Sequence, residues 1–242
     1  MQTLILGSLF SIAILATTFW HSKAGLSTFL NPEGLIIVLG GTVSILLMTS
    51  NKKELMGLFR QIKRLIFSKA SKRDIREVLI DCSKTMEKGK FPSTTGVDFL
   101  DKSLGWLGAG LSGATLDKLL VDGAKLEIER IHQSANVLAN IGKYPPALGM
   151  VGTVFGIIAI FNGLGNAEGQ RTLGTNLAFA MTATLYGLVT SNFVISPLSE
   201  LLLQAAHQEE VELSMIVETV KLWSDKESLF FVQEHIGLYH AS

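Results

Sequence analysis

The sequence predicts an all-α integral membrane protein. It would have four transmembrane helices and a cytoplasmic helical bundle formed by the loop between spans 2 and 3 and the C-terminal tail. Three observations predict this class: four long runs without charge, basic residues concentrated in one segment, and a mean hydropathy of +0.37. Charged residues make up only 17% of the 242 residues, which excludes a disordered chain. Since 21 Lys+Arg balance 21 Asp+Glu, the net charge gives no indication of a nucleic-acid partner.

The predicted spans are residues 1–20, 34–51, 144–167 and 172–199, none of which contains Asp, Glu, Lys or Arg. A bilayer core of roughly 30 Å requires about 20 mostly apolar helical residues, and soluble core helices seldom reach that length without charge. The first run lacks a basic start and a small-residue cleavage site. We therefore interpret it as a span and not as a signal peptide.

Basic residues near the span ends predict the orientation. Many follow the second span directly, whereas the loop before it offers only Lys23 and residues 162–174 offer only Arg171. Cytoplasmic loops retain Lys and Arg, so both short loops are expected outside the cell. The N-terminus, residues 52–143 and the tail 200–242 are then cytoplasmic.

Helical spacing of apolar residues predicts the cytoplasmic elements. Residues 52–69 form an amphipathic pattern, which fits either a helix on the anionic inner leaflet or an ordinary basic flank of the span. Residues 91–96 combine Pro, Gly and small polar residues, so a loop is expected there. Helical spacing resumes from Thr115 and again from Leu202 to Trp223, which predicts a compact helical bundle.

No motif for catalysis is present. The sequence has no phosphate-binding glycine loop, no paired-histidine zinc motif and no nucleophile elbow, so we expect no enzyme, catalytic residue or cofactor. No metal site is expected either, because the five histidines lack ligand spacing: His21, His132, His207, His235 and His240. The lone Cys82 excludes an internal disulfide and is interpreted as a small buried residue.

The predicted spans contain no titratable carboxyl or amine, so this chain alone should not carry protons. The third span instead places small residues on one side: Gly149, Gly152 and Gly156. Gly152 and Gly156 form a Gly-x-x-x-Gly pair, which allows close approach of another helix. We therefore favour helix packing for these glycines.

Hydroxyl groups accompany these small residues. Thr153 lies on the small-residue side of the third span, and Thr184 lies on a similar side of the fourth. Two interpretations stay open for both: helix packing, or lining a hydrated ion path. Among the prolines, Pro146 opens the third span, and Pro197 is expected to kink or stop the fourth near its inner end.

Several motifs resemble one family. The third span contains Tyr-Pro-Pro-Ala-Leu-Gly-Met-Val-Gly-Thr-Val-Phe-Gly at 144–156. The fourth contains Thr-Ala-Thr-Leu-Tyr-Gly at 182–187 and Ser-Asn-Phe-Val-Ile-Ser-Pro-Leu at 191–198, and Asn31-Pro32 precedes the second. The sequence thereby resembles the MotA/PomA family of flagellar motor stator proteins, within the MotA/TolQ/ExbB superfamily.

The resemblance implies an ion-conducting stator subunit in the bacterial inner membrane. Five copies would form a ring around a single-span MotB/PomB-type partner, which supplies the membrane aspartate and binds peptidoglycan. The ring would convert flow of Na⁺ or H⁺ into torque on the rotor protein FliG. By motif match, Thr153 and Thr184 correspond to ion-path hydroxyls of the sodium-driven branch, which favours Na⁺. Pro146 and Pro197 correspond to membrane prolines involved in torque.

The cytoplasmic loop departs from the family pattern. Where the family carries an Arg-rich stretch followed by a glutamate, this chain reads Glu-Lys-Gly-Lys-Phe-Pro-Ser-Thr at 87–94. Lys88 and Lys90 are the candidate rotor contacts. Two alternatives stay open: an ExbB/TolQ-like or other non-flagellar ion-driven motor subunit, and a structural membrane scaffold.

Overall fold

The computed structural model describes residues 29–67, 74–92, 94–165 and 167–239, with a few positions between 6 and 17. Within these residues every regular element is a helix and none is a strand, which confirms the all-α prediction for this part of the chain. The predicted first span lies mostly outside the described residues.

The chain divides into two compact units, whose boundary falls inside helices α4, α7 and α10. Unit 1 comprises residues 1–62 and 133–203, and unit 2 comprises residues 63–132 and 204–242. The shared helices are α4 (Lys52–Phe67), α7 (Gly113–Ile141) and α10 (Ser196–Ser224).

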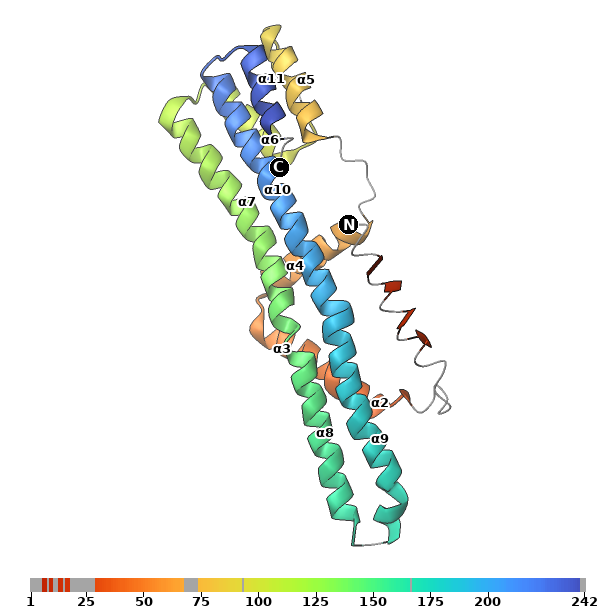
Figure 1. Ribbon diagram of the computed structural model, residues 1–242. Coiled ribbons are helices and arrows are strands. Elements are labelled where there is room, and N and C mark those ends of the chain that lie inside the picture. Colours follow the sequence, from red (N-terminus) through yellow and green to blue (C-terminus); the bar gives the residue numbers. More distant parts are fainter. Residues whose placement is uncertain are drawn as a thin grey trace. The chain divides into compact units, whose positions relative to one another are not determined.

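Unit 1 is built around a close pair of helices, α8 (Tyr144–Gly163) and α9 (Ala167–Val189), which lie side by side (Figure 1). Before them in sequence come α2 (Pro32–Leu35), the π-helical segment η2 (Ile36–Gly40) and α3 (Gly41–Thr49). The side chain of Asn31 caps α2 by accepting a hydrogen bond from the Gly34 N–H over 3.1 Å.

Helix α9 starts earlier than the predicted fourth span, at Ala167 and not Thr172. Glu168 and Arg171 shorten the uncharged run but do not prevent helix formation, because both have good helix propensity. A run without charge therefore marks the apolar part of a helix and not its ends.

The helix does not stop at Pro197, although the sequence predicted that this proline would either kink the helix or stop it. Helix α9 continues through the π-helical segment η3 (Thr190–Ile195) directly into α10. A proline lacks an N–H and its ring clashes with the carbonyl one turn earlier. The wider π turn just before Pro197 accommodates this local defect while the helix continues.

Unit 2 has a continuous hydrophobic core. Helices α5 (Ile75–Glu87), α6 (Asp98–Gly108) and α11 (Leu229–Leu238) contribute to it together with parts of α7 and α10. Its fully buried side chains include Leu79, Leu100, Leu116, Leu120, Met215, Ile216, Val220, Val232 and Ile236. The indole N–H of Trp223 donates to Ser83 Oγ over 3.0 Å and ties α10 to α5.

Three helical stretches among the described residues are long and apolar enough to cross a membrane: Pro32–Thr49, Gly113–Gly163 and Gly169–Ser224. Length and composition alone define these candidates. They include most of the predicted second and third spans and all of the fourth.

Candidate functional site

Two threonine hydroxyls meet between α8 and α9. Thr153 Oγ1 and Thr184 Oγ1 lie 2.5 Å apart, a short hydrogen bond. The carbonyl oxygens of Gly149 and Ala180 lie 3.2 and 3.1 Å from Thr153 Oγ1, and 3.3 and 3.5 Å from Thr184 Oγ1. We call these four oxygen atoms the oxygen cluster.

The glycines of α8 permit this meeting. A Cβ added at Gly149 would lie 2.9 Å from the Ala183 carbonyl oxygen, and one at Gly152 would lie 2.5 Å from the Ala183 Cβ. At Gly156 the added atom would meet Ala180 Cβ at 2.6 Å. The three residues form the glycine face of α8, which brings the α9 backbone close enough for Thr184 to reach the Gly149 carbonyl.

The oxygen cluster has more acceptors than protons. Two hydroxyls supply two protons, whereas the four oxygens offer several lone pairs. The residues Thr153 and Thr184 are half-buried. Such an arrangement can accept hydrogen bonds or replace part of the hydration shell of a cation.

Ser191 binds a backbone carbonyl at the junction of α7 and α8. The carbonyl of Gly142 lies just beyond the end of α7, and Pro146, one turn later, has no N–H to offer it. The Ser191 hydroxyl takes that place and donates to Gly142 O over 2.6 Å, with Ser191 only 6% exposed. The sequence placed Ser191 near the motif but gave no signal for this partner.

Tyr186 is a second residue whose role sequence reasoning missed. Its hydroxyl accepts a hydrogen bond from the Asn31 N–H over 2.8 Å and donates to the carbonyl of Phe29. These bonds attach the start of α2 to α9. The Tyr-Gly pair at 186–187 was recognised only as part of a motif.

Lys88 and Lys90 belong to unit 2, whereas the oxygen cluster belongs to unit 1. Both lysines follow the end of α5 and are exposed, and Gly89 between them adopts φ +71°. Thr95 belongs to the predicted loop 91–96. Its N–H and its hydroxyl each donate a hydrogen bond to Asp101 Oδ1 over 2.7 Å, which attaches Thr95 to α6.

Histidine and cysteine side chains in unit 2 differ in their surroundings. His235 forms a 2.6 Å hydrogen bond with Glu218, whereas His132 and His207 approach Glu210 at longer distances. The positions of His132, His207 and Glu210 in the sequence did not indicate that these three side chains lie close together. Cys82 is buried, and this desolvation, together with Asp101 and Asp81, raises the pKa of its thiol to about 11. His21 and His240 lie outside the described residues.

The model of the MotA/TolQ/ExbB proton channel family matches residues 97–215, a range that holds α7, α8 and α9 and both threonines. The match covers just under half of the chain, and this part of the chain is similar to the family. The resemblance seen in the motifs is thereby confirmed, and the matched family is one of channels.

Similar proteins match this chain over nearly its whole length. It is 24% identical over 235 residues to the chemotaxis protein PomA of Vibrio alginolyticus, covering 95% of this chain and 90% of that protein. The structure of C. jejuni MotAB matches with a TM-score of 0.82 at 17% identity, covering 98% of this chain and 94% of that one. The flagellar MotAB stator complex of Bacillus subtilis matches with a TM-score of 0.78 at 20% identity, covering 95% and 92%. These two likenesses show the fold of this chain.

Proposed function

We propose that this chain is an ion-conducting stator subunit of the bacterial flagellar motor. The observation that carries the proposal is the oxygen cluster, formed where two uncharged helical stretches of a channel-family protein pack closely. The names PomA and MotAB, borne by relatives that cover nearly the whole chain, support the flagellar assignment.

The chain requires a partner that contributes a titratable group. Residues 34–51, 144–167 and 172–199 contain no Asp, Glu, Lys or Arg, although proton carriers depend on such groups. A MotB/PomB-type single-span subunit would supply a membrane aspartate beside the oxygen cluster and would anchor the complex to peptidoglycan. The MotAB complexes with similar folds support such a partner.

Exposed apolar side chains support a membrane ring. Helix α8 exposes Met150, Val154, Phe155, Ile158 and Phe161, and α9 exposes Leu177, Met181 and Leu188. Such apolar surface is stable against lipid or neighbouring subunits and unfavourable in water. We place four spans in the inner membrane with both termini cytoplasmic, and five copies in a ring around the partner.

The cytoplasmic elements would transmit torque. The exposed Lys88 and Lys90 provide positive charge for contact with FliG, and Pro146 and Pro197 allow the membrane helices to change conformation. This function needs neither a cofactor nor an enzymatic activity. Its cargo is an ion, and the oxygen cluster favours Na⁺, because hydroxyl and carbonyl oxygens can replace hydration water.

The test is motility of a stator-deleted bacterium that expresses this chain together with its candidate partner. Swimming speed is recorded while sodium is varied at constant ionic strength. Speed that rises with sodium supports a sodium-driven stator, whereas speed that is indifferent to sodium and abolished by a protonophore assigns H⁺. Absence of rescue by an assembled complex contradicts the flagellar assignment.

A second candidate function is an ExbB/TolQ-like motor outside the flagellum. The matched family includes TolQ and ExbB, and the 87–94 sequence departs from the stator pattern. The same complementation distinguishes the two, because only a flagellar stator restores swimming. A purely structural scaffold would give neither motility nor partner-dependent ion conductance.

A further inference from the structure

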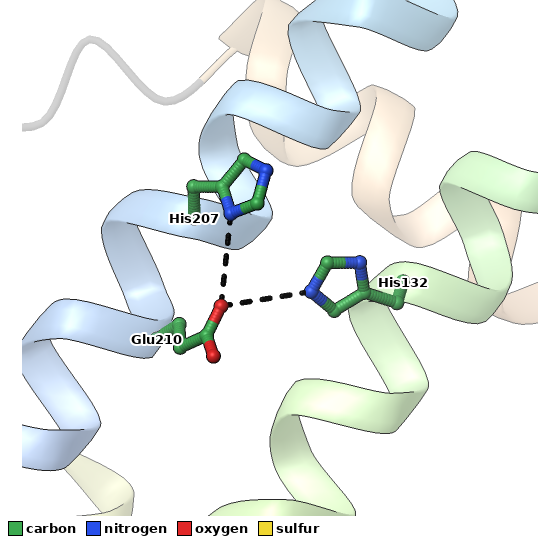
Figure 2. Close-up of side chains that lie close together, drawn as sticks. All are labelled: His132, His207 and Glu210. Atoms are coloured by element: carbon green, nitrogen blue, oxygen red, sulfur yellow. Dashed lines mark ion pairs between the residues drawn. The ribbon is translucent and has the colours of Figure 1, made fainter.

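Three potential metal ligands converge in unit 2. His132 on α7 and His207 and Glu210 on α10 lie close together, and one carboxylate oxygen of Glu210 approaches a ring nitrogen of each histidine (Figure 2). Glu210 Oε2 lies 3.6 Å from His207 Nδ1 and 3.9 Å from His132 Nε2, and all three ligand atoms lie within 4.8 Å of one another. We call these residues the histidine cluster.

Two helices position the cluster. His207 and Glu210 are three residues apart on the continuous helix α10, so their side chains share one face. His132 comes from α7, which supplies the third ligand from a separate segment. The side chains are 30% (His132), 65% (His207) and 47% (Glu210) exposed, so an ion can reach them from solvent.

The distances fit an intervening ion better than direct hydrogen bonds. A hydrogen bond would bring nitrogen and oxygen to about 2.7–3.2 Å. His235 and Glu218 of the same unit do so at 2.6 Å, whereas His132 and His207 stay 3.6 Å or more from Glu210. Ligands of a tetrahedral Zn²⁺ with bonds of about 2.0–2.2 Å are roughly 3.3–3.6 Å apart. Small side-chain rotations therefore close the cluster around such an ion.

The ligand types select the class of ion. Two imidazoles and one carboxylate suit Zn²⁺ and related transition metals, while Ca²⁺ and Mg²⁺ prefer oxygen ligands. With neutral imidazoles the three side chains carry one negative charge, which attracts a divalent cation. Three protein ligands leave a fourth position for water.

We propose that His132, His207 and Glu210 bind one divalent transition-metal ion of the Zn²⁺ class and thereby cross-link α7 to α10 within unit 2. The proposal is independent of the flagellar assignment, because it rests on residues outside the oxygen cluster. Bound metal would hold the two helices together at this level of the unit.

The test uses the full chain in detergent, purified through an affinity tag without histidine and stripped with a chelator. Co²⁺ is titrated as a spectroscopic probe, and Zn²⁺ is then added as competitor. We expect ligand-field absorption that saturates at one Co²⁺ per chain and disappears with Zn²⁺. Absence of saturable absorption, together with no bound Zn²⁺ after dialysis, overturns the proposal.

Matched variants locate the ion. His207→Gln and Glu210→Gln should each weaken Zn²⁺ binding by about tenfold or more, since each removes one of three ligands. The control is His235→Gln, which removes a histidine of the same unit that already bonds to Glu218 and should leave binding unchanged. Far-UV circular dichroism verifies that each variant is folded. Binding that is lost in the control, or kept when His132 and His207 are both replaced, contradicts the assignment.

Discussion

Ser191 donates its hydroxyl proton to the carbonyl oxygen of Gly142 over 2.6 Å, at the junction where α7 ends and α8 begins. Gly142 follows the last residue of α7, and Pro146, one turn later, has no N–H that could bind its carbonyl. A side chain of the adjoining η3 segment thus completes a hydrogen bond that the backbone of α8 cannot make.

The first prediction concerns this bond. Ser191→Ala should leave the buried Gly142 carbonyl unpaired and cost about 1–3 kcal/mol. Thermal unfolding of the chain in detergent should show a midpoint several degrees lower. Ser196→Ala is the control, because Ser196 is exposed. Equal midpoints for the two variants would show that the bond contributes nothing.

The second prediction concerns the glycine face of α8. Gly152→Ala places a methyl group where the Ala183 Cβ would be 2.5 Å away, so α8 and α9 must separate. Overpacking of this kind costs about 1–3 kcal/mol. The control is Gly174→Ala on α9, where an added Cβ meets nothing within 4 Å. The midpoint should fall for the first variant and stay or rise for the second.

The third prediction separates the hydroxyl of Thr184 from its shape. Thr184→Val keeps the branched side chain but removes the Oγ1 that lies 2.5 Å from Thr153 Oγ1. Thr184→Ser keeps that oxygen. If the oxygen cluster lines the ion path, the valine variant should lose swimming while its complex still assembles, and the serine variant should retain it. Normal, sodium-dependent swimming of the valine variant would assign the threonines to packing alone.

The fourth prediction concerns Cys82. Burial raises the pKa of its thiol from the ordinary 9.0 to about 11, so the folded chain should hold about a hundredfold less thiolate at pH 8 than the unfolded chain. Alkylation by iodoacetamide should be correspondingly slow in detergent and fast in denaturant. The folded state binds this proton more tightly, so the stabilisation is complete below pH 9 and is lost as pH rises through about 11. Equal alkylation rates in the two states would contradict the burial.

Residue patterns predicted the helical class and the family, because both depend on local information. Missing charges marked the apolar helices, and the motif at 144–156 carried the resemblance. The η3 segment was not predicted, since Ser191 finds its acceptor 49 residues away in the chain. His132 and His207 were likewise considered separately, because only the packing of α7 against α10 brings both near Glu210.

The π-helical segment η3 also sets the rotational phase of the helix that follows. Gly187, Ser191, Ile195 and Ser199 are all buried at a spacing of four residues. In an unbroken α-helix each such step advances by about 40°, so three steps would turn the buried line through about 120°. The wider turn absorbs this drift and leaves Ser199 facing the Ala135 carbonyl, to which it donates at 3.2 Å. The π-helical turn thus allows the continuous helix formed by α9, η3 and α10 to pack against α8 along one stretch and against α7 along the next.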